Sequence, residues 1–359
     1  MKVSLVFLKL SFTKKMYIYI MYKTLLNSAL FCVVFFFGNG AALAQNEVLS
    51  QHHMTLKQPP YLKAGDTVAI VAPAGILKQR EGEIQKAKAL LKGWGLHAVV
   101  GKHVFNQGRH FAGTDDERCE DFQNALNNPS ISAIWCARGG YGSVRILDKL
   151  DWSTFKENPK WIIGYSDITA IHNEVHDLGI QSLHAMMCTS LQDDAETIAV
   201  TVSTFKSALF GDNLSYTLKG SQYNQPGTVS APLVGGNLTI LHTMLGSKTS
   251  IDTSGKILFI EEIGEYKYHI DRMLQSLKRA GYFENCKGVI IGDMTKIKRN
   301  TTPWGSTIEQ LILDVLADYN FPVAFNMKAG HEKDNRALIL GKTVEMKVRK
   351  TETSLRFIH

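Results

Sequence analysis

The sequence predicts an α/β fold in two parts: an N-terminal α/β domain with a parallel sheet and a smaller C-terminal domain of mixed α/β structure. Short apolar or β-branched runs alternate with longer segments of helical spacing along most of the chain. This alternation is typical of βαβ units, in which helices cover both faces of a parallel sheet. A stretch rich in Gly, Asn, Ser and Gln at 212–231 interrupts it, and 359 residues suffice for two domains.

The elements of the first part have local signals. The run DTVAIVAP (66–73) is a strand that ends at a proline. The helix at 114–126 begins at Thr114, and Glu117 completes a capping box with acids in the first turn. Helical spacing of apolar residues predicts helices at 78–95, 141–150 and 167–179, and short apolar or β-branched runs predict strands at 97–104, 133–138 and 160–166.

The second part repeats the alternation on a smaller scale. It predicts strands at 256–264, 288–294 and 321–327, helices at 268–281 and 306–319, and closing strands at 337–348 and 354–359. We therefore expect a nucleophile-bearing N-terminal domain at 61–211, a linker at 212–231 and a C-terminal domain at 232–359.

The first 44 residues differ from the rest. They contain five lysines and no Asp, Glu or Arg, followed by the apolar run ALFCVVFFFG (29–38) and the small residues Ala42-Leu43-Ala44. This pattern is typical of a secretory signal peptide cut before Gln45, and an uncleaved N-terminal anchor is the alternative. Residues 45–60 are polar, end in two prolines and are expected to form a tether. The predicted location is outside the cytoplasm, in the periplasm.

Charge and cysteine content exclude several function classes. The formal net charge is +7, and removal of the five leader lysines leaves +2, so the charge does not favour nucleic-acid binding. After leader removal no stable membrane insertion is expected. The four remaining cysteines, Cys119, Cys136, Cys188 and Cys286, show neither a CxxC pair nor zinc spacing, so we expect buried thiols, although Cys119 and Cys286 could pair. No metal site or cofactor is predicted.

The stretch WIIGYSDITAIHNEV (161–175) places a serine at a sharp corner between strand and helix. A glycine before such a corner admits a strained backbone, and the hydroxyl of Ser166 would project at the sheet edge, where helix-start amides can bind an oxyanion. The fifth position of G-x-S-x-G is Ile168, however. Ser166 or Asp167 could instead simply cap the following helix.

A nucleophilic serine also needs a histidine and an orienting acid. His331 lies in KAGHEKDN (328–335), a glycine-containing turn after an apolar strand, and three acids follow another strand: Glu261, Glu262 and Glu265. A strand-end carboxylate is more often solvated than catalytic. His172 and His176 lie four residues apart, but without a third metal ligand we expect them on a solvated helix face.

Seven stretches, in this order, resemble the LD-carboxypeptidase family, serine peptidases that include the microcin C immunity peptidase. They are LKAGDTVAIVAPAG, FAGTDDERCEDFQNAL, WCARGGYGSVRILDKLD, KWIIGYSDITAIH, GGNLTIL, FIEEIGEYKYHIDRML and AGHEKDNRALILG. The resemblance extends over nearly all of residues 58–345 and implies an active site at the interface between the two domains.

The resemblance also implies roles for individual residues. The family's nucleophile corresponds to Ser166, its catalytic histidine to His331 and its catalytic glutamate to Glu261, with Glu262 and Glu265 as alternatives. The backbone amides of Asp167 and of Gly139 or Gly140 correspond to the family's oxyanion donors.

Substrate contacts are expected from three further side chains. Arg138 is a candidate partner for a substrate carboxylate, with a structural ion pair as the alternative. Tyr165 and His184 are expected to line the substrate site. Where the family often has His-Gly-Pro-Met, this chain has HAMM (184–187), so its substrate preference could differ.

The resemblance implies a serine carboxypeptidase that removes the terminal D-alanine of murein tetrapeptides, in peptidoglycan turnover or recycling. Two alternatives stay open: a peptidase acting on an antibiotic-like peptide-nucleotide, and a non-catalytic exported ligand-binding protein. The expected partner is the murein peptide, and because family members are often dimeric, a homodimer is among the implied assemblies.

Overall fold

A computed structural model of the chain describes residues 56–358. The predicted signal peptide at 1–44 and the tether residues 45–55 lie outside the described residues. The end of the predicted tether belongs to the fold, because the backbone of Lys57 bonds to Gly179 and Gln181 with N–O distances of 2.7 and 3.0 Å. Within residues 56–358, none of the helices combines the length and apolar character that spanning a bilayer requires.

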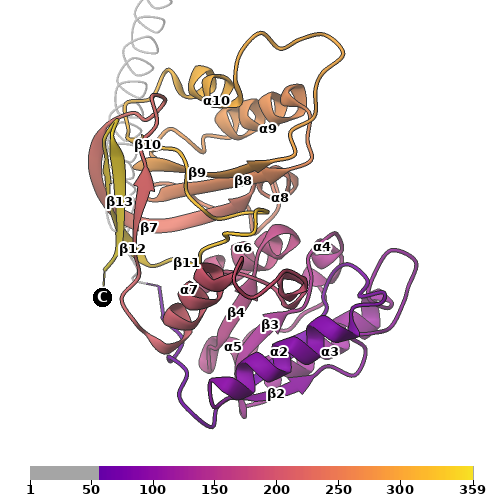
Figure 1. Cartoon of the computed structure of the whole chain (residues 1–359). Helices are drawn as coiled ribbons and strands as arrows, with labels where there is room; N and C mark the ends of the chain where they lie inside the picture. Colours follow the sequence, from indigo (N-terminus) through magenta and orange to yellow (C-terminus); the bar gives the residue numbers. More distant parts are fainter. Residues whose placement is uncertain (1–55, 359) are drawn as a thin grey trace, which may run out of the picture. The chain divides into compact units, whose positions relative to one another are not determined.

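The first sheet has six strands in the order β11-β5-β4-β3-β1-β2. Figure 1 labels β11, β4, β3 and β2 of this sheet. All neighbouring strands are parallel except β11 and β5. The strands are β1 (Thr67–Val71), β2 (His97–Val100), β3 (Ile131–Cys136), β4 (Trp161–Gly164), β5 (Ser182–His184) and β11 (Leu338–Leu340). The predicted parallel α/β architecture of the first part is confirmed.

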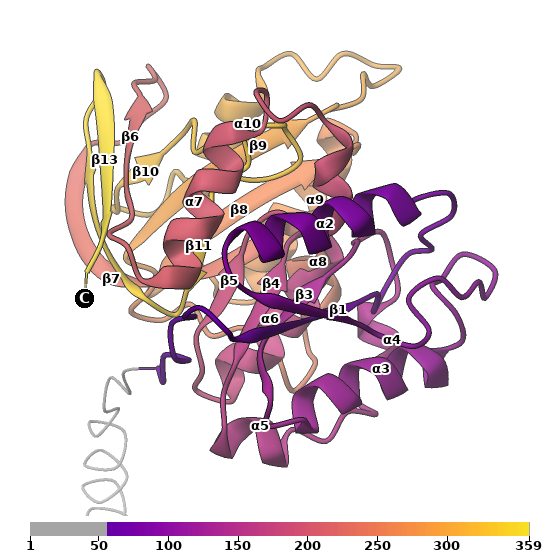
Figure 2. The same ribbon diagram turned by 60° about the horizontal axis from the view of Figure 1, so that its bottom comes forward.

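Helices cover both faces of this sheet. They are α2 (Glu81–Gly93), α3 (Asp115–Asn127), α4 (Ser143–Leu147), α5 (Ser153–Glu157), α6 (Thr169–Asp177) and α7 (Ala199–Phe210). On β1, Val68 and Ile70 pack in one core with α2 and α7, whereas Ala69 and Val71 pack in a second core with α3 and α6. Figure 2 shows α2 and α3 on opposite sides of the strands. The alternation along β1 follows from the two-residue side-chain period of a strand.

The second sheet has seven strands in the order β10-β9-β8-β7-β12-β13-β6. The strands are β6 (Ser215–Lys219), β7 (Gly227–Asn237), β8 (Ile257–Ile263), β9 (Gly288–Thr295), β10 (Val323–Ala324), β12 (Thr343–Val348) and β13 (Glu352–Phe357). Strands β7 to β10 are parallel, and the remaining pairs are antiparallel. This confirms the predicted mixed α/β second part.

The two sheets share one hydrophobic core. On one face of the second sheet lie α8 (Leu238–Thr243), α9 (Lys267–Arg279) and α10 (Ile308–Leu316). The opposite face contributes Phe259 and Ile290 to the core that also contains Phe205 of α7 and Leu183 of β5. The halves are therefore packed together, and residues from β4 and β8 can meet at a common site.

Two predicted segments near the C-terminal half have a different organisation in the structure. The predicted linker at 212–231 also contains β6 and the beginning of β7, both strands of the second sheet. The single closing strand predicted at 337–348 is divided: β11 joins the first sheet and β12 the second. Gly341 lies between the two strands and has a φ of 85°. Glycine adopts this left-handed conformation without strain because it has no Cβ, so the chain can turn here from one sheet to the other.

Candidate active site

Ser166 occupies the predicted corner and has an uncommon backbone conformation. Strand β4 ends at Gly164, and the 3₁₀ helix η1 (Ser166–Ile168) begins two residues later. The φ of Ser166 is 62°, in the left-handed region that non-glycine residues rarely adopt. A Cβ on Gly164 would lie 2.8 Å from the Ile168 side chain, which explains the glycine there. Strain of this kind costs roughly 1–3 kcal/mol and is characteristic of functional corners.

His331 reaches Ser166 from the second half of the chain. It follows Gly330 in the turn after β10, and its Nε2 lies 3.0 Å from Ser166 Oγ. Its Nδ1 lies 2.8 Å from Oε2 of Glu261, whose side chain on β8 is fully buried. The three side chains thus form one hydrogen-bonded chain, with the imidazole between a hydroxyl and a carboxylate.

The other two acids predicted as alternatives are engaged elsewhere. Glu262 is buried and accepts hydrogen bonds from the N–H and the hydroxyl of Thr239, at 2.8 and 2.7 Å, at the start of α8. Glu265 lies 2.5 Å from Nδ1 of His269. Neither contacts His331, because successive side chains of a strand point to opposite faces and β8 ends before Glu265. The expectation that strand-end carboxylates are usually solvated is wrong for Glu261 and Glu262, because both side chains are buried.

The pKa of His331 is raised above its usual value. Burial opposes the charged ring, but the charge and hydrogen bond of Glu261, with smaller contributions from Glu262 and Asp293, outweigh it. A ring with a raised pKa is a better proton acceptor, and the neighbouring carboxylates favour the imidazolium that forms when it accepts a proton.

Two backbone segments that the sequence predicts as oxyanion donors lie next to Ser166 in the chain or in space. Asp167 is the second residue of η1, and the first N–H groups of a helix have no partner within it. Gly139 is in contact with the serine, since a Cβ there would lie 3.1 Å from Ser166 Cβ and 3.3 Å from Oγ. Gly140, at a φ of 101°, continues the same turn.

The three predicted substrate-contact residues have different environments. Arg138 is half-buried, its Nη1 donates to the Ile76 carbonyl, and among the described residues it has no acidic partner. Burial and the nearby charge of Arg80 lower the pKa of Arg138. The ring of Tyr165 packs edge-on against His331 with centroids 5.0 Å apart.

His184 is fully buried between Tyr165 and Phe259, and neither ring nitrogen has a hydrogen-bond partner within residues 56–358. The prediction of direct substrate contact therefore needs correction in this structure: β5 places the ring behind Tyr165. Its burial keeps the pKa well below the usual value, so the ring is neutral.

Comparison with known proteins assigns the family. A Bacillus subtilis (strain 168) protein named probable murein peptide carboxypeptidase is 33% identical over 295 residues, which cover 80% of this chain and 91% of that protein. The LD-carboxypeptidase N-terminal domain matches residues 68–185, and the LD-carboxypeptidase C-terminal domain matches residues 230–346. The chain belongs to the LD-carboxypeptidase family. It is therefore a serine-type carboxypeptidase, a hydrolase, as the resemblance predicts.

One further relative and two solved structures are also similar to this chain. The murein tetrapeptide carboxypeptidase of Pseudomonas aeruginosa (PAO1) is 30% identical over 288 residues, 77% of this chain and 91% of that protein. The crystal structure of muramoyltetrapeptide carboxypeptidase from Oxalobacter formigenes has 27% identity and a TM-score of 0.74, and the match covers 82% of this chain and 99% of that one. The microcin C7 self-immunity protein MccF, at 22% identity and a TM-score of 0.74 over 84% and 98% of the two chains, shares the fold.

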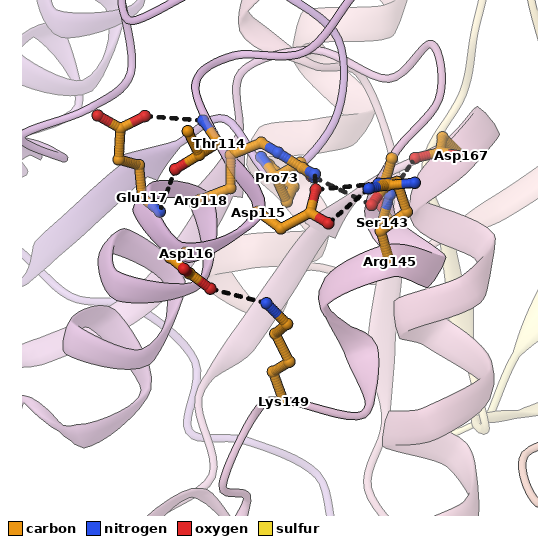
Figure 3. Close-up of polar contacts among 11 residues, drawn as sticks. Pro73, Thr114, Asp115, Asp116, Glu117, Arg118, Ser143, Arg145, Lys149 and Asp167 are labelled. Carbon is orange, nitrogen blue, oxygen red and sulfur yellow. Dashed lines mark hydrogen bonds and ion pairs between the residues drawn. The ribbon is translucent and has the colours of Figure 1, made fainter. Parts of the chain in front are cut away.

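The family-like segment that begins at FAGTDDER contains a buried arginine, Arg118, with a structural role. Arg118 of α3 donates to the carbonyl oxygens of Pro73 and Gly142 and pairs with Asp115, and its side chain is fully buried (Figure 3). Pro73 follows β1, and Gly142 follows the Gly-Gly turn beside Ser166. The arginine therefore connects two loops that border the serine corner.

The same network extends to the serine corner itself. Ser143 N–H donates to the Asp167 carboxylate at 2.8 Å (Figure 3). Arg145 pairs with Asp115 at 2.7 Å. The capping box of Thr114 and Glu117, predicted from the sequence, is present at the start of α3. The sequence did not predict that Arg118 connects the loops at Pro73 and Gly142. The position of a charged residue within an amphipathic helix, next to a capping box, could have indicated a structural role.

The histidine pair on α6 corrects another expectation. His172 is buried, and its Nε2 lies 2.9 Å from the carbonyl oxygen of Gly164, so it does not lie on a solvated face. The pKa values of His172 and His176 are both lowered to about 4 by burial. Helix α6 is enclosed because α8 and β7 of the second half pack against it. The four cysteines within residues 56–358 are free, and Cys136, Cys188 and Cys286 are buried.

Proposed function

We propose that this chain removes the C-terminal D-alanine from murein tetrapeptides by hydrolysing the bond to the L-centre of the preceding diamino acid, in peptidoglycan turnover or recycling. The names of its relatives, a murein tetrapeptide carboxypeptidase and a muramoyltetrapeptide carboxypeptidase, support the substrate class. The observation that carries the mechanism is the hydrogen-bonded chain from Ser166 through His331 to Glu261.

In the first half-reaction, His331 Nε2 accepts the proton of Ser166, and Oγ forms a bond to the scissile carbonyl carbon. Glu261 holds the other ring nitrogen, so that Nε2 faces the hydroxyl, and it stabilises the imidazolium. The tetrahedral intermediate then collapses. His331 returns the proton to the departing nitrogen, D-alanine leaves as the free amino acid, and the shortened peptide stays on Ser166 as an ester.

In the second half-reaction a water molecule replaces D-alanine. His331 accepts a proton from the water, the resulting hydroxide attacks the ester carbonyl, and the proton passes to Ser166 Oγ as the acyl bond breaks. In both steps the N–H groups of Asp167 and of Gly139 or Gly140 donate to the oxyanion. Such donors contribute about 3–4 kcal/mol to transition-state stabilisation when correctly placed.

A carboxypeptidase must also recognise a free terminal carboxylate, and Arg138 is the candidate. A guanidinium without a counter-ion is costly to bury and is repelled by a second arginine. Arg138 lies one residue before Gly139, which is packed against Ser166. A substrate carboxylate bound there would supply the missing negative charge. Tyr165, beside His331, is the second proposed substrate contact.

The decisive experiment is incubation of the purified chain with a defined murein tetrapeptide. Mass spectrometry should show the loss of one alanine, and chiral analysis should identify it as the D-isomer. The Ser166→Ala variant serves as the control, and equal product formation by both proteins would contradict the serine mechanism. A peptide-nucleotide substrate in a parallel reaction tests the alternative, and faster cleavage of that substrate would favour it.

We also propose export to the periplasm, on the evidence of the five lysines, the apolar run and the A-x-A site in residues 1–44. Cell fractionation and N-terminal sequencing of the isolated protein test this proposal, with Gln45 as the expected first residue. The homodimer implied by the resemblance is tested by light scattering during size-exclusion chromatography.

A further inference from the structure

Asp293 contacts the main chain on both sides of His331. It lies near the end of β9, where its N–H donates to the carbonyl oxygen of Ala329 at 3.0 Å. Its side-chain carboxylate lies close to the N–H of Glu332, which acts to lower the pKa of Asp293. The segment between these two contacts consists only of Gly330 and His331, so a single residue holds the turn before and after the imidazole.

The packing of the turn leaves little space for movement. Gly330 has a φ of 144°, and a Cβ there would lie 3.0 Å from Asp293 Cβ and 3.1 Å from Glu261 Oε2. The glycine backbone is therefore in direct contact with both acids. A shift of the Asp293 backbone or side chain would be transmitted to the residue that bears the imidazole.

The carboxylate of Asp293 is poorly satisfied for a buried group. Its Oδ2 is buried and has no hydrogen-bond partner among the described residues. An unsatisfied buried polar atom costs about 1–3 kcal/mol, so stability alone does not account for an acid at this position. Burial raises the pKa of Asp293 to about 6. Lys328 opposes this shift, whereas Glu332 and Glu261 add to it.

We propose that Asp293 is a positioning residue for His331: its two contacts fix the turn that carries the imidazole, and its negative charge favours the protonated ring. The inference rests on the proposed role of His331 as general base. The charged groups around the imidazole are Glu261 and Glu262 of β8 and Asp293 of β9, and all three favour the imidazolium. Those around Asp293 are Glu261 together with Lys328 and Glu332 of the turn.

Two substitutions separate the contact from the charge. Asp293→Asn retains a side-chain oxygen that can accept from Glu332 but carries no charge, whereas Asp293→Ala removes both. We expect kcat to fall about 10²-fold for the alanine variant with little change in KM, since small displacements of a catalytic group have effects of this size. The asparagine variant should lose only several-fold in kcat. Its kcat/KM should decline at a lower pH than that of the wild type.

A direct readout of the imidazole makes the test independent of turnover. NMR titration of ring-labelled histidines, with His331→Gln for assignment, should show a lower pKa for His331 in Asp293→Asn than in the wild type. Asp314→Asn is the matched control, because Asp314 is exposed on α10 and bonds to Gln310. Wild-type kcat, pH profile and imidazole pKa in both Asp293 variants would overturn the inference.

The outcome can be distinguished from failure of the proposed function. Unchanged Asp293 variants alongside an inactive Ser166→Ala enzyme would contradict the positioning role alone. Full activity of Ser166→Ala would contradict the serine mechanism and with it the role of His331 that Asp293 supports.

Discussion

Nε2 of His331 lies 3.0 Å from Oγ of Ser166, although 165 positions separate the two residues in the chain. One belongs to the corner after β4 of the first sheet, the other to the turn that follows β10 of the second. The catalytic hydrogen bond that we propose therefore exists only when both halves of the chain are folded and packed together.

Removal of either partner of this hydrogen bond should abolish most activity. We expect Ser166→Ala and His331→Ala each to lower kcat by about 10⁴- to 10⁶-fold, and the double variant to be little worse, because the two residues act as a unit. Steady-state kinetics on a murein tetrapeptide would measure this. Ser254→Ala, at an exposed loop position, should behave as wild type. Additive losses in the double variant would contradict a shared role.

Glu261→Gln should have a smaller effect on kcat and a clear effect on its pH dependence. The carboxylate of Glu261 raises the pKa of His331, so its removal should lower that pKa. The base must be neutral, and activity is lost as pH falls through its pKa. The acid limb of the kcat/KM profile should therefore move to lower pH. An unmoved limb would contradict the contact between Glu261 and the imidazole.

The neighbouring Glu262→Gln is a matched comparison, because it should affect stability more and the pH profile less than Glu261→Gln. It loses a carboxylate that accepts from Thr239 at the start of α8, and the charge of that carboxylate makes a smaller contribution to the raised pKa of His331 than Glu261 does. We expect a loss of about 1–3 kcal/mol in the free energy of unfolding and a shift of the acid limb to lower pH that is smaller than in Glu261→Gln. Denaturant titration and the same kinetic assay would measure the two effects.

Gly139→Ala should reduce activity more than stability. The new Cβ would lie 3.1 Å from Ser166 Cβ and 3.3 Å from Oγ, so the serine must shift. A displacement of this kind should lower kcat about 10- to 100-fold. Gly82→Ala in α2 is the control, since its Cβ would meet nothing within 4 Å. Gly82→Ala should raise stability by up to about 0.5–1 kcal/mol; equal kcat values for the two variants would contradict the proposed geometry.

Arg118→Ala should destabilise the protein strongly. It removes a fully buried guanidinium that connects two loops through Pro73 and Gly142 and leaves Asp115 with fewer partners. The carbonyl oxygens of Pro73 and Gly142 lose a buried donor, at a cost of about 1–3 kcal/mol for each group left unsatisfied. Lys149→Ala, whose exposed ammonium pairs with Asp116, should change stability by less than about 1 kcal/mol. Thermal unfolding of both variants tests the contrast.

Arg138→Met should raise KM with a smaller effect on kcat if the guanidinium binds the terminal carboxylate. The matched substrate is the tetrapeptide with a C-terminal carboxamide, which lacks that negative charge. Wild type should discriminate against the amide, and the variant should treat both substrates nearly alike. A loss of activity equal for the two substrates would indicate instead that Arg138 acts only through its contact with Ile76.

Much of the fold could be predicted because local signals agree with the tertiary structure. The capping box at Thr114 is a property of a few adjacent residues, and the structure contains it. The β-branched run of β1 predicted a strand in a sheet with helices on both faces, and its side chains lie in two cores on opposite faces. Prediction failed where an element depends on distant partners. Strand β11 has three residues, and only its pairing with β5 makes it part of the first sheet.

Local sequence patterns were enough to predict the alternation of strands and helices, the glycine-serine corner at 164–166, the candidate histidine and acids, and the family. These features depend on residues that are close together in the chain, and the side-chain periods of helices and strands allow them to be predicted. Only the folded chain shows which acid contacts His331, that His172 and His184 are buried, and that Arg118 connects the loops around the serine. These contacts depend on how the two sheets pack across a shared core. Glu261 and His331 are 70 positions apart in the chain, and no local pattern shows which side of a strand will face so distant a residue.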